Sequence, residues 1–131
     1  MAKIEKFEDI EAWRSARVVT RMVYDASNGE RFCRDFALCN QIRRASISII
    51  SNIAEGFERG GNKEFVQFLA VAKGSCGEVR AQMYVALDQG YVDEARFKEI
   101  VDKLNETSRM IAGFIKYLQQ SDLRGAKFKQ P

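Results

Sequence analysis

The sequence contains no histidine, so it lacks the side chain that most often moves protons or binds metals near neutral pH. Acid–base chemistry would fall to carboxylates, lysine, tyrosine or cysteine. The three cysteines form no CxxC pair, so a zinc site would need three thiolates and a carboxylate. No P-loop, GxGxxG, GxSxG or Glu-x-x-His motif occurs. We therefore expect no catalytic residue, no cofactor and no metal site.

Proline and long apolar runs are also scarce. The single proline is the last of 131 residues, and the chain has nine glycines. So few helix breakers favour long helices over an all-β or loop-rich fold. No stretch approaches the roughly eighteen apolar residues of a membrane span, and the N-terminus lacks the apolar region of a signal peptide. We expect a cytoplasmic protein with reduced thiols and no membrane partner.

The residues that are present predict one domain built from four helices. Apolar residues recur at steps of three and four, which is typical of helices with a buried face. Turn signals place the helices at about 8–27, 35–55, 62–89 and 93–119, followed by a basic tail at 120–131. Asn28-Gly29 and Gly56 are the predicted ends of the first two helices, and Asn62 and Asp93 are the predicted N-caps of the last two. Short connections favour an all-α, up-down-up-down antiparallel four-helix bundle. Cys39 and Cys76 fall on apolar faces and are predicted to be buried.

The segment Gln41–Gly56 belongs to a predicted helix that has more apolar surface than one bundle interface needs. With 100° per residue, the apolar residues of 35–55 cover an arc of about 200°, roughly twice what a helix at a monomer's surface requires. A second copy of the chain is the simplest cover for the excess, with Ile47 and Ile50 in the contact. Loops or the tail are the alternative cover.

Arg43 lies inside this apolar arc, where its guanidinium needs acceptors. We expect it to pair with a carboxylate across a helix or subunit boundary, and Glu55 and Glu78 are the first candidates. The alternative is that its methylene stem carries the charge out to solvent. If Arg43, Glu55 and Glu78 instead converge with Tyr84 on an open polar pocket, the protein is a small-ligand binder or an enzyme.

The helix predicted at 62–89 has a second face made of small residues, Ala70, Gly74, Gly77 and Ala81. Each glycine in the middle of a helix costs about 1 kcal/mol relative to alanine. Close approach of another helix backbone would explain this cost. Gly74 and Gly77 are therefore predicted assembly residues, and drift without a packing reason is the alternative.

The basic residues indicate a nucleic-acid partner, but this indication is less specific than those for assembly. The net charge is +3, and most proteins with such a charge are simply soluble and do not bind nucleic acid. Arginines on one stripe of the first helix can follow a phosphate backbone, although a solvated basic face is commoner. Asp25 and Glu11 dilute this field, and no aromatic platform accompanies the arginines. The residues predicted for possible contact with RNA or DNA are Arg14, Arg17, Arg21, Arg44, Lys127 and Lys129.

The residues Gln41-Ile42-Arg43-Arg44-Ala45, Ser48-Ile49 and Ser51-Asn52-Ile53-Ala54-Glu55-Gly56 resemble the signature of the 23S rRNA intervening-sequence protein family. The resemblance extends over about residues 4 to 118. It includes Phe7, Trp13, Lys63-Glu64-Phe65, Phe68-Leu69, Ala72, Gly74-Ser75, Glu78 and Gly90-Tyr91. Ala45-Ser46-Ile47 departs from the Ala-Val expected after the arginine pair.

This resemblance implies a bacterial four-helix bundle that assembles into a ring, a homopentamer. The family is named after genes inside insertions in 23S ribosomal RNA genes, and its molecular function is not established. A distantly similar group is the pentameric accessory protein of diversity-generating retroelements, which contacts reverse transcriptase and nucleic acid. The resulting hypothesis is a non-enzymatic, homo-oligomeric scaffold or RNA/DNA-associated factor. Besides the ligand-binding alternative, a protein-interaction module for a neighbouring gene product stays open.

Overall fold

The computed structural model describes residues 4–121, and helices account for nearly all of them. No strand occurs within this range, so the all-α prediction is confirmed. The elements are a 3-10 turn η1 (Phe7–Asp9) and the helices α1 (Glu11–Ser27), α2 (Glu30–Arg34), α3 (Phe36–Arg59), α4 (Asn62–Asp88) and α5 (Glu94–Gln120).

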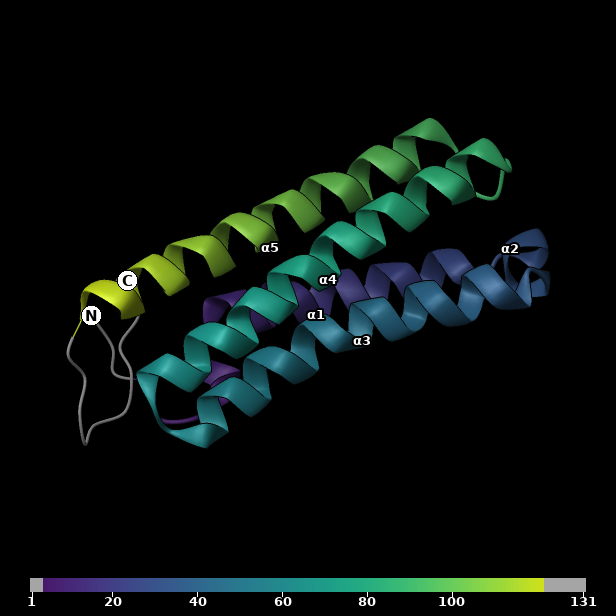
Figure 1. Ribbon diagram of the computed structural model, residues 1–131. Helices are drawn as coiled ribbons and strands as arrows, with labels where there is room; N and C mark the ends of the chain where they lie inside the picture. The colour runs from purple at the N-terminus through teal and green to yellow at the C-terminus, as the bar shows by residue number, and fades with distance from the viewer. Residues whose placement is uncertain (1–3, 122–131) are drawn as a thin grey trace.

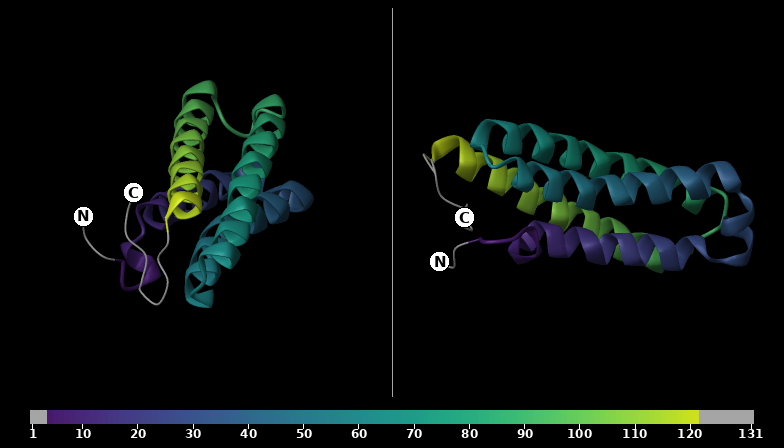
Figure 2. Two further views of the ribbon diagram at one scale, coloured as in Figure 1. Left: turned by 60° about the vertical axis from the view of Figure 1, so that its left-hand side comes forward. Right: turned by 90° about the horizontal axis from the view of Figure 1, so that it is seen from below.

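The four long helices pack in a closed cycle (Figure 1). Contacts join α1 to α3, α3 to α4, α4 to α5, and α5 back to α1. Figure 2 shows the same rods from two other directions, with η1 and the end of α5 at the same end of the molecule. The interior holds side chains from every long helix, and the largest fully buried ones include Phe32, Phe57, Phe65, Phe114 and Met83. Cys39 and Cys76 are buried, as predicted.

Gly56 does not end α3, which corrects the helix end predicted at this glycine. The helix continues to Arg59 and is closed by Gly60, whose φ of 86° lies in the left-handed region. A Cβ on Gly56 would lie 2.7 Å from the Cβ of Phe68 and 2.9 Å from Cδ1 of Phe65. Gly56 therefore lets the first turns of α4 pack directly against the α3 backbone.

One of the two predicted N-caps is confirmed and the other is not. The Asp93 carboxylate accepts a hydrogen bond from the Arg96 amide at 2.7 Å and caps α5, as predicted. Asn62 is the first residue of α4 rather than its N-cap. Its side-chain amide instead donates to the carbonyls of Leu118 and Ser121, both at 3.2 Å. The predicted cap therefore ties the end of α5 to the start of α4.

The wide apolar arc of α3 is mostly covered inside the chain. The helix contacts α1, α2, α4 and η1. The contacts with α2 and η1 come in addition to the two neighbours of a helix at the corner of a four-helix bundle. Leu38, Cys39, Ile42, Ala45, Ile49 and Ile53 are all buried. Ile47 remains 39% exposed and Ile50 is half-buried. The breadth of the arc therefore does not by itself require a second copy, although Ile47 and Ile50 keep apolar surface outside the bundle.

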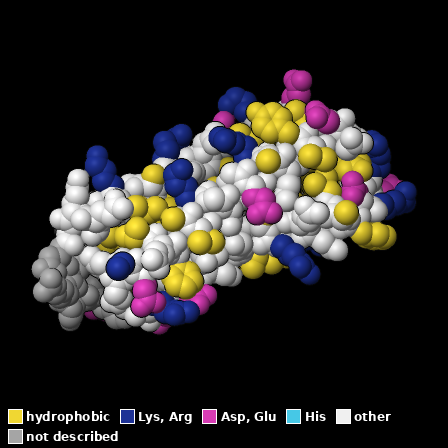
Figure 3. All heavy atoms as spheres, viewed as in Figure 1, with side chains coloured by type: hydrophobic (Ala, Val, Ile, Leu, Met, Phe, Trp, Pro, Cys, Tyr) yellow, Lys and Arg dark blue, Asp and Glu magenta, His cyan; other side chains and the backbone are white. Residues whose placement is uncertain are grey.

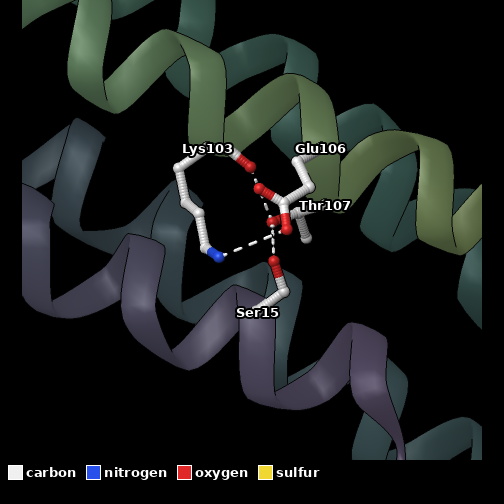
Figure 4. Close-up of polar contacts among 4 residues, drawn as sticks. All are labelled: Ser15, Lys103, Glu106 and Thr107. Atoms are coloured by element: carbon white, nitrogen blue, oxygen red, sulfur yellow. Dashed lines mark hydrogen bonds and ion pairs between the residues drawn. The ribbon is translucent and has the colours of Figure 1, made fainter.

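A buried pair of hydroxyl groups holds α1 and α5 in register. The hydroxyls of Ser15 on α1 and Thr107 on α5 lie 2.6 Å apart in the core. Thr107 also donates to the Lys103 carbonyl at 2.8 Å, so Ser15 donates to Thr107 (Figure 4). A buried hydroxyl without a partner costs on the order of 1–3 kcal/mol. The α1–α5 interface is therefore favoured at the one offset that pairs these two groups.

Gly56→Ala is expected to destabilise the protein by about 1–3 kcal/mol, because the new methyl group would overlap Phe68 and Phe65. Urea denaturation followed by circular dichroism measures this. Gly113→Ala is the matched control, since Gly113 is an exposed interior residue of α5 and its Cβ would meet nothing within 4 Å. That change should stabilise by about 0.4–1 kcal/mol. Equal effects at the two positions would contradict the close approach at Gly56.

Burial raises the pKa of the Cys76 thiol from 9.0 to about 11, although the nearby Lys73 ammonium lowers it slightly. The folded protein then holds the thiol proton more tightly than the unfolded chain. The contribution of this proton to the free energy of unfolding is fully present below pH 9 and is lost as pH rises from about 9 to 11. At 1.36 kcal/mol per pKa unit, the loss is up to about 3 kcal/mol. Urea unfolding of Cys76→Ala across this range should show a shallower decline than wild type, and an unchanged decline would refute the assignment.

Candidate functional site around Arg43

Arg43 links the first half of α3 to the C-terminal end of α1. Its Nε donates to the Ser27 hydroxyl and its Nη2 donates to the Asn28 side-chain oxygen, both at 2.8 Å. The guanidinium lies 4.6 Å from the ring centroid of Tyr24. A cation at this position also faces the partial negative charge at the end of α1. Arg43 is therefore satisfied by neutral oxygens, a helix end and an aromatic face.

The two carboxylates predicted to pair with Arg43 are engaged elsewhere in the chain. Glu55 forms an ion pair with Arg59 at 2.9 Å, and this hydrogen bond raises the pKa of Arg59. Glu78 accepts from the Gln82 amide at 3.3 Å on its own helix. The expected pairing within one chain is therefore wrong. The structure also does not bring Arg43, Glu55 and Glu78 together, so the polar pocket of the ligand-binding alternative is not formed by them. The sequence could not show this, because the acceptors of Arg43 are uncharged residues on another helix.

A second cluster joins α2 to the α4–α5 connection and was not identified from the sequence. Asp35 accepts from the Leu38 amide at 3.1 Å with one oxygen and from the Tyr91 hydroxyl at 3.0 Å with the other. This hydrogen bond, followed by burial, raises the pKa of Tyr91. Arg31 lies over the Tyr91 ring, 5.5 Å from its centroid, and donates to the Gln89 carbonyl at 3.2 Å. An acidic residue just before an apolar run was the available signal for Asp35 as a cap.

The arginine stripe on α1 is divided between structural and exposed residues. Arg14 donates to the carbonyls of Glu8 and Asp9, both at 2.9 Å, and so closes the end of η1. Arg17 lies 5.9 Å from the centroid of the Trp13 ring. Arg21 and Arg44 are exposed. Lys127 and Lys129 lie outside the described residues.

The small-residue face of α4 is open within the chain. Ala70, Gly74, Gly77 and Ala81 are exposed, and a Cβ at either glycine would meet nothing within 4 Å. The close contact predicted for this face is therefore not made within residues 4–121.

Metal-ligating clusters and membrane-spanning helices are both absent from residues 4–121. No group of three or more acidic or cysteine side chains is placed to hold a metal ion in that range. No helix there is long and apolar enough to cross a membrane.

Arg43→Met should lower the free energy of unfolding by about 1–3 kcal/mol, because it removes two hydrogen bonds from a charged donor. Thermal or urea denaturation measures the change. Arg44→Met is the matched control, since this neighbour is exposed and its replacement should stay within about 0.5 kcal/mol. If both variants melt like wild type, Arg43 does not tie α1 to α3.

Comparisons with known proteins agree with the fold and the motif. The chain is similar over 80% of its length to a solved protein of unknown function from the S23 ribosomal protein family of Bacteroides thetaiotaomicron, with a TM-score of 0.73 and 20% identity. The match covers 98% of that protein. No curated protein matches the chain. A family model described as 23S rRNA-intervening sequence protein matches residues 8–113. The chain therefore belongs to the 23S rRNA-intervening sequence protein family.

Proposed function

We propose that the protein is a non-enzymatic scaffold, an up-down-up-down helical bundle that assembles into a homo-oligomeric ring. The cyclic contacts of the four long helices support the arrangement of the bundle. The observation that carries the assembly is the open face of α4, defined by Ala70, Gly74, Gly77 and Ala81. A flat face of small residues lets a neighbouring helix approach closely, which offsets the cost of glycine within a helix.

The second contact surface is the outer apolar side of α3. Phe36 is 74% exposed and Ile47 is 39% exposed, while Ile50 and Ala54 beside them are half-buried. Bulky side chains on α3 complement the small residues on α4, so each protomer carries two different and matching surfaces. Contacts between unlike surfaces run head to tail and close into a ring when the rotation permits. The family resemblance indicates five subunits.

The non-enzymatic part of the proposal rests on how the polar residues of the family signature are used. Arg43 holds the end of α1, Glu55 is paired with Arg59, and Asn52 donates to the Ser48 carbonyl at 2.8 Å. Ser48 lies 2.9 Å from Ser75 across the α3–α4 interface. The signature thus supports helix packing rather than a set of groups converging on a substrate.

Light scattering tests the assembly directly. Wild type should have a mass near five times the 14.9 kDa of one chain. Gly74→Leu should dissociate it by filling the α4 face, and Ile47→Glu should do so by placing a charge on the α3 face. Gly113→Leu is the matched control on α5 and should keep the wild-type mass.

Mixing the two defective variants identifies the kind of contact. Each would retain one intact surface, so head-to-tail assembly predicts a dimer of about twice the mass of one chain and nothing larger. A mixture that stays monomeric while both variants remain helical would contradict pairing of α3 with α4. A monomeric wild type would contradict the ring. The two faces would then be contact surfaces for a different protein.

A further inference from the structure

A polar groove runs between the outer sides of α4 and α5, away from the Arg43 contacts. It encloses about 190 Å³ and is lined by Lys73, Gly77 and Arg80 from α4 and by Asn105 and Ser108 from α5. Arg80 donates to the Asn105 side-chain oxygen at 3.1 Å, which fixes its guanidinium at the α5 side. A Cβ on Gly77 would meet no atom within 4 Å, so the groove is open above this residue.

The charge at this groove is positive and not neutralised by the protein. None of its lining residues is acidic. The carboxylates of α5 nearest in sequence are engaged by other cations, Asp102 by Lys98 at 2.6 Å and Glu106 by Lys103 at 3.4 Å. Among residues 4–121, the exposed cations without an ion pair on α4 and α5 include Lys73, Arg80, Arg109 and Lys116. Figure 3 shows dark-blue side chains along this upper side of the molecule.

An exposed aromatic ring stands one helical turn beyond Arg80 on the same flank of α4. Tyr84 is 53% exposed, and its ring contacts Phe97 of α5 edge to face, with the centroids 4.9 Å apart. Phe97 therefore holds the tyrosine ring in place while much of its surface stays open. A fixed aromatic ring beside a basic groove is the arrangement on which an unpaired base can stack.

We propose that this α4–α5 groove binds single-stranded nucleic acid, with backbone phosphates on Lys73 and Arg80 and a base on Tyr84. Arginine, lysine, asparagine and serine side chains are ordinary donors to phosphate oxygens. Lys73 and Arg80 are seven residues apart, or about 10 Å along the helix axis. When both side chains extend away from the helix, one free phosphate ion cannot contact the two of them. Successive phosphates of one strand can.

This site differs from the arginine stripe of α1, where Arg14 closes η1 and Arg17 lies against Trp13. The groove borders the small-residue face of α4, because Gly77 belongs to both, whereas the side chains proposed to hold the strand are Lys73, Arg80 and Tyr84.

Fluorescence anisotropy with labelled 15-nucleotide oligo-U and oligo-dT tests the proposal between 50 and 200 mM salt. Wild type should bind both, with affinity falling steeply as salt rises. The Lys73→Gln/Arg80→Gln double variant should lose about tenfold or more at low salt and reduce the log–log salt slope by about 1.4. Tyr84→Leu should lose roughly tenfold while keeping the slope, because stacking releases no counterions.

The controls separate this groove from other surfaces. Arg17→Gln/Arg21→Gln removes the same formal charge from α1 and should change affinity less than twofold. Light scattering of the groove variant should give the wild-type mass, which distinguishes loss of binding from loss of assembly. The proposal is overturned if wild type does not bind, if the α1 variant loses the binding instead, or if duplex binds as tightly and Tyr84→Leu has no effect. Equal competition by polyglutamate would also overturn it, because the groove would then accept any acidic polymer.

Discussion

The close approach of α3 and α4 at Gly56 is the constraint on which the rest of the structure depends. With no side chain there, Phe65 and Phe68 rest directly on the α3 backbone, only a few residues from the turn that joins the two helices. A residue with a Cβ would push the helices apart at this end. The two-helix unit then offers α3 to α1 on one side and α4 to α5 on the other. The positions of the remaining helices follow from the spacing set at this point.

The presence of the long helices was predictable because it follows from apolar periodicity, which each segment shows by itself. Helix ends were less predictable where a residue type has two physical uses. Gly56 and Gly60 are both compatible with a helix stop, and only the tertiary contact with Phe68 distinguishes them. Asn62 is equally suited to cap its own helix or to bond to α5, and the structure uses the second option. The short α2 carries too few residues for a periodic pattern to show.

The candidate sites show the same difference between features that depend on one helix and features that depend on contacts between helices. Sequence spacing indicated that α4 has a small-residue face and that Arg43 needs acceptors, because both follow from one helix alone. It could not name Ser27 and Asn28 as those acceptors, since that requires knowing how α1 and α3 are offset. The α1 arginines were predicted for possible contact with RNA or DNA, and the Arg14 side chain bonds to carbonyls of its own chain. The α4–α5 groove joins residues about thirty positions apart and has no linear signature.

The hydrogen bond between Ser15 and Thr107 spans 92 positions in the sequence. The α3–α4 unit, by contrast, is connected by two residues, so closing that loop costs little chain entropy. Packing of α1 against α5 has to wait until the chain between them is largely ordered, because long-range contacts bear the largest entropy of closure. On closure entropy alone, the α1–α5 interface is expected to be the last part of the bundle to form. During synthesis, the apolar face of α1 is therefore fully buried only after nearly the whole chain has been made.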